Sequence, residues 1–188
     1  MDIKNHFLNH RLILDSFLNN EDNFIFIQKA ADLMLNSIKN GGTIFSCGNG
    51  GSMCDAIHFA QELSGYFNKK RKALPAICIS DSSHITCVAN DTSFEFIFSR
   101  FLEGNGKKGD CLLAISTSGN SINVINAAKE AQKKNMKVIS LSSNSGGELS
   151  KYTDVSICVS SKSTDSIQEM HITIIHSIIS YIEEKLNL

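Results

Sequence analysis

The sequence is poor in the features that mark membrane proteins and proteins divided by linkers. It has one proline and no tryptophan among 188 residues, and no low-complexity linker interrupts it. No apolar run approaches the roughly 18 residues needed to span a bilayer. Polar residues break up the apolar ones near the start, which is not expected of a secretory signal. Membrane association is therefore not expected.

Charge and cysteine content narrow the class further. The 18 Lys+Arg against 19 Asp+Glu leave no positive excess for gripping a nucleic-acid backbone, so nucleic acid is not an expected partner. The six cysteines form no C-x-x-C pair and lie mostly within apolar runs. This pattern is typical of buried thiols in a reducing compartment, and not of a disulfide framework or a cysteine–zinc site. We predict a cytoplasmic protein.

The chain is predicted to form a single domain over residues 1–188, with a helical extension at 1–40 and an α/β core at 41–188. Apolar residues recur at helical spacing over 7–17 and again over 25–38, and Gly41-Gly42 would end the second helix. The expected strands of the core are Thr43–Cys47, Ala76–Ile79, Cys111–Ile115, Val138–Leu141 and Val155–Val159. The expected helices between and after them are Asp55–Leu63, Phe94–Leu102, Ile122–Lys134 and Ile167–Leu186.

Apolar strands separated by helices predict a parallel sheet covered on both faces. The fold class is therefore α/β, with a five-stranded parallel sheet in a three-layer α/β/α arrangement preceded by N-terminal helices. In such sheets ligands bind beyond the carboxyl ends of the strands. Residues that directly follow the strands are thus the first candidates for a site.

A glycine-rich loop, Gly48-Asn49-Gly50-Gly51-Ser52, follows the first expected strand. Its glycines allow a ligand to approach the backbone closely, and Ser52 could cap the helix that follows. The loop is not a P-loop, because no Gly-Lys-[Ser/Thr] is present, and it lacks the dinucleotide G-x-G-x-x-G spacing. An ordinary strand-to-helix turn explains it equally well.

A hydroxyl-rich loop follows the third expected strand and opens another helix. Its hydroxyl residues are Ser116, Thr117, Ser118 and Ser121. A helix N-terminus surrounded by hydroxyls is suited to bind phosphate, whereas an ordinary capped turn would need only one of them. A nucleoside triphosphate usually also requires a lysine in such a loop. The loop therefore favours a monophosphate ester, bound as a recognition handle.

Four further side chains have the chemistry of an acid–base or metal site. His58 and Glu62 are spaced i, i+4 on one helix and could ligate a metal, position a catalytic carboxylate, or form a solvated pair. Gln168 and His176 lie eight residues apart, about 80° around the last helix and about 12 Å along it. A shared site would draw more easily on another element or another subunit. His176 lies in an apolar stretch, where a core histidine is the usual explanation.

Together these segments resemble the sugar isomerase (SIS) domain and, more narrowly, the bacterial phosphoheptose isomerase family. The resemblance is carried by residues 46–63, 83–91, 115–121 and 167–176. It implies isomerisation of sedoheptulose 7-phosphate to D-glycero-D-manno-heptose 7-phosphate through an enediol. The product would supply heptose to lipopolysaccharide or another surface glycan.

The resemblance also implies residue roles. Glu62 would be the base and His176 its acid–base partner. A zinc ion would be held by His58, Glu62, Gln168 and His176. The implied substrate contacts are Asn49, Gly50, Gly51, Ser52, Glu62, Asn90, Asp91, Ser116, Thr117, Ser118, Ser121 and Gln168. The protein would be a homotetramer with sites at subunit interfaces, and the extension 1–40 would be used in that packing.

Two positions depart from the family pattern. Tyr66 and Ser166 stand where relatives often have arginine, and Lys69, Lys70 and Arg71 could compensate. Two other functions stay open. A SIS protein without activity could sense a sugar phosphate or bridge protein partners, and an isomerase could act on a different ketose phosphate.

Overall fold

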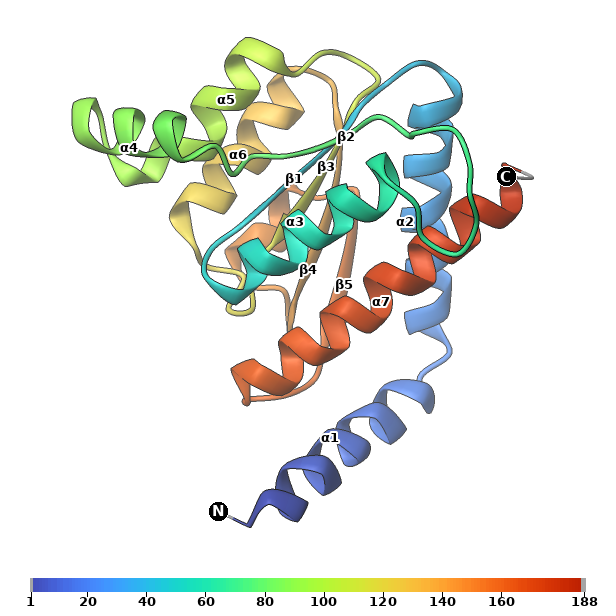
Figure 1. Cartoon of the computed structure of the whole chain (residues 1–188). Coiled ribbons are helices and arrows are strands. Elements are labelled where there is room, and N and C mark those ends of the chain that lie inside the picture. The colour runs from blue at the N-terminus through green and yellow to red at the C-terminus, as the bar shows by residue number, and fades with distance from the viewer. Residues whose placement is uncertain (1, 187–188) are drawn as a thin grey trace.

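The computed structural model describes residues 2–186 and contains one parallel sheet flanked by helices (Figure 1). The strands are β1 (Ile44–Gly48), β2 (Ala76–Cys78), β3 (Cys111–Ile115), β4 (Lys137–Ser143) and β5 (Val155–Val159). The helices are α1 (Ile3–Leu18), α2 (Asp22–Lys39), α3 (Gly51–Ser64), α4 (Ser82–Asp91), α5 (Ile97–Asn105), α6 (Ile122–Lys133) and α7 (Thr164–Lys185), with 3-10 turns η1 (Phe94–Phe96) and η2 (Glu148–Tyr152). The predicted α/β class with five parallel strands is confirmed.

The strand order places the two predicted ligand loops side by side. The order is β2-β1-β3-β4-β5, and all neighbours are parallel. The chain therefore goes to one side of β1 to form β2 and then crosses to the other side to form β3. Gly48 at the end of β1 is in register with Ile115 at the end of β3. The loops that follow these two strands leave the same edge at the topological switch point, where open α/β sheets bind ligands.

Two hydrophobic cores cover the two faces of the sheet. On one face Ile44 and Leu113 pack with α2, α3 and α7. On the other face Phe45 and Leu112 pack with α5 and α6. All residues of β1 and β3 are buried, as expected for central strands covered by helices on both sides. Figure 1 shows α3 and α7 lying next to each other on the first of these faces.

The structure contains one helix that was not expected, and it begins two other helices earlier than expected. Helix α4 was not expected; its N-cap Asp81 accepts a hydrogen bond from the backbone N–H of His84 at 2.8 Å, which starts the helix in a stretch with little apolar periodicity. Helix α3 begins at Gly51, four residues earlier than expected. Ser52 is consequently buried inside α3 and Gly50 is the N-cap, so the expectation that Ser52 caps this helix is wrong. Helix α7 begins at Thr164, three residues earlier than expected.

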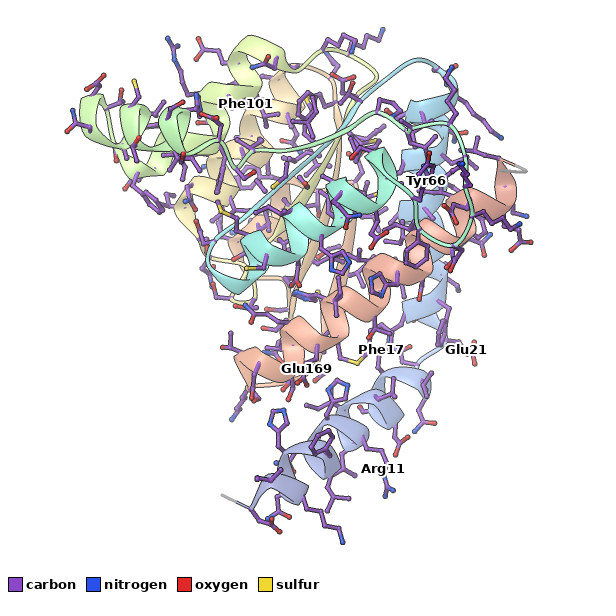
Figure 2. The ribbon with its side chains drawn as sticks, in the orientation of Figure 1. Arg11, Phe17, Glu21, Tyr66, Phe101 and Glu169 are labelled. Carbon is purple, nitrogen blue, oxygen red and sulfur yellow. The ribbon has the colours of Figure 1, made fainter. Side chains whose placement is uncertain are left out.

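Helix α1 extends away from the rest of the chain (Figure 1). His6 and His10 lie against the carboxylate of Glu169 on α7, at 3.1 and 2.8 Å, and Figure 2 shows Glu169 pointing toward α1. Phe7 is nevertheless 70% exposed, and Ile3 and Leu12 are similarly exposed. The helix thus presents an apolar surface that no other described residue covers. Among the described residues, no helix is both long and apolar enough to cross a membrane.

Candidate active site

The centre of the candidate site is a cluster of three side chains between α3 and α7. His58 and Glu62 lie one turn apart on α3, and His58 Nε2 donates to Glu62 Oε1 at 2.9 Å. His176 comes from α7, and its ring meets that of His58 edge to face, with centroids 5.1 Å apart. One donor atom from each of the three residues lies within 4.8 Å of the others. The parallel packing of α3 and α7 therefore brings together residues more than 100 positions apart.

The environment of His176 differs from that of an ordinary core histidine. Phe67 stacks on the His176 ring, with centroids 5.2 Å apart and planes 29° apart. The Nε2 atom of His176 is buried and has no hydrogen-bond partner among the described residues. Leaving a buried polar atom unpaired costs about 1–3 kcal/mol, so such an atom calls for an explanation. A ligand at the cluster would supply the missing partner.

A second carboxylate, Asp55, lies one turn before His58 on α3. Burial raises the pKa of Asp55 to about 6, while the nearby His58 opposes the shift. Its Oδ2 atom is also buried, and no residue in the described range 2–186 hydrogen-bonds to it. Sequence reasoning missed Asp55, although its spacing of three from His58 and seven from Glu62 puts all three residues along one helical face. Asp55 is therefore a further ionisable group beside the cluster.

The three-residue cluster fits a zinc ion. Two imidazoles and a carboxylate form a donor set that catalytic zinc sites commonly use, and three protein ligands leave a position open for substrate or water. The unpaired Nε2 of His176 adds a free donor atom to this set. The predicted fourth ligand, Gln168, has its amide against Gly51 in the first turn of α3. A Cβ atom on Gly51 would lie 2.5 Å from both Nε2 and Oε1 of Gln168, so only glycine leaves room for that amide.

The glycine loop and the start of α6 are joined by a reciprocal amide pair. Asn49 Nδ2 donates to Asn123 Oδ1 at 2.8 Å, and Asn123 Nδ2 donates back to Asn49 Oδ1 at 2.9 Å. Asn123 is buried, and sequence reasoning missed it. Its only signal was an amide in an otherwise apolar first turn. The pair fixes the glycine loop relative to the hydroxyl loop that precedes α6.

The hydroxyl loop makes a tight turn at the start of α6. Ser116 Oγ donates to Ser121 Oγ at 3.0 Å, and Ser121, the N-cap of α6, makes no side-chain capping bond. Gly119 has φ of +66°, and a Cβ atom there would lie 2.0 Å from the carbonyl oxygen of Gly146. The loop therefore requires glycine at 119 and keeps its N-cap hydroxyl free of the helix.

A cavity of about 280 Å³ adjoins this loop and brings in a cation that sequence reasoning missed. Thr117 and Ser118 line it on one side, and Lys162 and Thr164 line it on the other. Lys162 precedes Ser163, the N-cap of α7, and Thr164 is the first residue of that helix, so the cavity also faces its positive end. A larger cavity of about 450 Å³ lies between α5 and α6, but none of the predicted site residues lines it.

Asn90 and Asp91 are not brought to the cluster within this chain. They end α4, are partly or fully exposed, and interact locally, with Asn90 Nδ2 donating to Asp91 Oδ1 at 2.8 Å. Figure 1 places α4 on the side of the molecule away from α7. Asn90 and Asp91 could therefore contact a substrate at such a cluster only if the cluster belonged to another subunit.

The two departures from the arginine pattern have different surroundings. Tyr66 is exposed on the connection after α3 (Figure 2), whereas Ser166 is buried in the first turn of α7. Arg71 cannot compensate for them, since its side chain is only 1% exposed and is paired with Glu183 at 2.6 Å. That expectation is wrong for Arg71. Lys69 and Lys70 are exposed and remain available.

Comparison with known proteins supplies the family. The model of the SIS domain matches residues 8–143. The chain belongs to the SIS domain family. Within this family, it is 54% identical over 175 residues to a phosphoheptose isomerase of Cytophaga hutchinsonii, a match that covers 93% of this chain and 92% of the relative.

Solved structures of SIS proteins agree with the fold described above. The phosphoheptose isomerase GmhA of Neisseria gonorrhoeae superposes with a TM-score of 0.91 at 36% identity, covering 97% of each chain. A phosphoheptose isomerase of Francisella tularensis superposes with a TM-score of 0.82 at 35% identity, covering 93% of this chain and 97% of its own. The SIS assignment made from sequence motifs is confirmed.

Proposed function

We propose that this SIS protein is an aldose–ketose isomerase that converts sedoheptulose 7-phosphate to D-glycero-D-manno-heptose 7-phosphate. The observation that carries the proposal is the meeting of Glu62 and His176, with His58, at one point between α3 and α7. Relatives at about half identity over most of the chain are named phosphoheptose isomerases, which supports the same reaction.

The proposed chemistry is a proton transfer between adjacent carbons. The Glu62 carboxylate removes a proton from C1 of the open-chain ketose, next to the C2 carbonyl, and the electron pair forms the enediol double bond. Glu62 then returns the proton to C2 while the aldehyde forms at C1. His176 moves the accompanying proton between the two oxygens. Glu62 is 14% exposed and is oriented by His58, so its carboxylate is largely shielded from water yet accessible to a ligand.

The metal and substrate-contact roles are proposed from this cluster together with the family resemblance. We propose that His58, Glu62 and His176 hold zinc, which would stabilise the negative charge that develops on the enediol oxygens. Gln168 is proposed as a substrate contact beside Gly50 and Gly51, and the family resemblance also makes it a zinc ligand.

The phosphate group is proposed to bind at the hydroxyl loop. Ser116, Thr117, Ser118 and Ser121 would surround the phosphate, with Ser116 donating to the Ser121 hydroxyl so that Ser121 can donate onward. Lys162, which lines the same cavity as Thr117 and Ser118, would supply the positive charge that the loop itself lacks. The N-terminus of α6 adds its dipole to the same site. Asn49 and Ser52 would line the sugar chain between the phosphate and the acid–base cluster.

The proposed assembly is a cytoplasmic homotetramer that supplies heptose for lipopolysaccharide or another surface glycan. The exposed apolar surface of α1 supports packing of the helical extension 1–40 against other subunits. Asn90 and Asp91, which lie apart from the cluster in one chain, would reach a site completed by a neighbouring subunit.

The proposal is tested by incubating purified protein with sedoheptulose 7-phosphate, with and without added zinc. We expect turnover by the natural sequence and a loss of at least about 1000-fold for Glu62→Gln, which keeps the shape of the base but removes its basicity. Five- and six-carbon ketose phosphates serve as matched substrates. Binding of the sugar phosphate without any turnover would contradict the proposal and would favour a sensor or scaffold role.

A further inference from the structure

The connection between α3 and β2 crosses the carboxyl-terminal half of α7. We call residues 65–72 of this connection the strap. Asn68 attaches it to α7 twice: its backbone N–H donates to Glu183 Oε2 at 3.2 Å, and its Nδ2 donates to Ser180 Oγ at 3.3 Å. The main anchor, however, is Arg71.

Arg71 bonds at once to α7 and to the end of α3. Its Nε donates to Glu183 Oε1 at 2.6 Å, and both side chains are almost fully buried, at 1% and 4% exposed. Its Nη2 donates to the backbone carbonyl of Glu62 at 2.7 Å, and its Nη1 donates to the carbonyls of Leu63 and Gly65 at 2.9 and 3.2 Å. These carbonyls belong to the last turn of α3 and to its C-cap Gly65, and that turn has no basic residue of its own to bind them.

The strap also carries the aromatic ring that packs on His176. Phe67 lies four residues before Arg71 and stacks on the His176 imidazole at 5.2 Å between centroids. Its side chain joins the same core as α7 residues Ile175 and Ile179. The strap thus contacts the backbone of one proposed catalytic residue and the side chain of the other.

We infer that Arg71 is a positioning residue for the acid–base pair: it fixes the end of α3 that carries Glu62 and holds the strap so that Phe67 sets the plane of His176. The inference rests on the proposed roles of those two residues. Stability alone does not require this arrangement, because a well-packed apolar pair serves stability as well as a buried ion pair. An apolar pair could not donate to the carbonyl of Glu62.

The first test compares Arg71→Lys with a control of matched kind. Lysine keeps the charge facing Glu183 but lacks the planar fork that reaches the carbonyls of α3. We expect kcat to fall about 10- to 100-fold with KM changed less than about twofold, because misplacement by less than 1 Å is enough for such a loss. Asp110→Asn is the control. Asp110 is fully buried at the amino end of the central strand β3, and its carboxylate binds the Lys107 ammonium and accepts from the backbone N–H of Thr43 and of Lys107. This substitution should lower Tm but leave kcat within about twofold.

The second test does not depend on turnover. In protein with ¹³C-labelled histidine, the ring resonances of His176, assigned with His176→Gln, report the stacked Phe67 ring. We expect them to shift in Arg71→Lys and in Phe67→Leu, but to stay in place in Phe67→Tyr, which keeps the ring and should also keep kcat. His176 resonances unchanged in Arg71→Lys, or equal kcat in Arg71→Lys and Asp110→Asn well below Tm, would overturn the inference.

The two tests separate this inference from the proposed reaction. If the natural sequence fails to turn over sedoheptulose 7-phosphate, the function fails while the resonances still decide whether Arg71 orients His176. If Arg71→Lys cannot be purified, the comparison of Phe67→Leu with Phe67→Tyr decides instead. Equal kcat and equal His176 resonances in those two variants would then overturn the positioning role of the strap.

Discussion

Replacing Gly51 by alanine should damage the site without damaging the fold. Gly51 opens α3 and does not require positive φ, so its backbone accepts alanine. The added Cβ would lie 2.5 Å from Nε2 and Oε1 of Gln168, and 2.7 Å from its Cδ. Because these atoms end a flexible side chain, the amide can move away at little cost in stability. The substitution therefore acts as a displacement of Gln168.

Gly51→Ala should change the free energy of unfolding much less than it changes kcat/KM. Alanine in place of glycine stabilises a helix by at most about 1 kcal/mol, which offsets the cost of a new Gln168 rotamer. The loss of one or two hydrogen bonds from Gln168 to the substrate costs about 1–2 kcal/mol, which corresponds to a roughly 5- to 30-fold fall in kcat/KM. We expect the free energy of unfolding to change by less than about 1 kcal/mol.

The assay is a double-mutant cycle on kcat/KM with sedoheptulose 7-phosphate. Gly51→Ala and Gln168→Ala should each lower kcat/KM, and Gly51→Ala should cause almost no further loss in the Gln168→Ala background. Gly104→Ala is the matched control, since Gly104 lies in α5 and a Cβ there meets nothing within 4 Å. Equal losses from Gly51→Ala in both backgrounds would refute the steric reasoning.

Three further predictions follow from single contacts. Lys162→Met removes one cation beside the hydroxyl loop, so it should raise KM about 3- to 10-fold with kcat unchanged. Added salt should then weaken substrate binding less in this variant than in the natural sequence. Gly119→Ala should lower Tm sharply, since its Cβ would lie 2.0 Å from the carbonyl of Gly146 and its φ is positive. Burial lowers the pKa of His171 to about 4 from 6.5, so the unfolded chain binds the proton first. The contribution of His171 to the free energy of unfolding should be fully present above about pH 6.5 and should be lost toward pH 4, by up to about 3 kcal/mol. Urea titrations at a series of pH values measure this fall, and in His171→Gln the free energy of unfolding should depend less on pH over this range.

The fold could be predicted largely because the hydrophobic pattern is consistent with it. Strands such as Cys111–Ile115 are unbroken apolar runs, and the structure buries every residue in that run. Helix α4 could not be predicted in this way, since only Val88 in it is buried and its start depends on the Asp81 side chain. Periodicity detects a helix by the face it buries, so a helix that buries one residue gives little signal.

The residues of the candidate site could be chosen from the sequence, but their arrangement in space could not. The i, i+4 spacing places His58 and Glu62 together from sequence alone, whereas the approach of His176 depends on how α7 packs on α3. Gln168 illustrates the limit, because the spacing along α7 does not reveal that its amide occupies the space that Gly51 leaves empty. Arg71 was misread for a similar reason: its buried partner Glu183 is distant in the sequence.

The amide pair between Asn49 and Asn123 restricts which substitutions these two positions can accept during evolution. Each amide both donates and accepts, so the pair carries no charge and neither titrates nor responds to ionic strength. Aspartate at either position would set two oxygens against each other, and an apolar residue would leave a buried partner unsatisfied. We therefore expect Asn49 and Asn123 to be replaced together or not at all. A substitution at one of them is compatible with the fold only when the other has already changed to accommodate it.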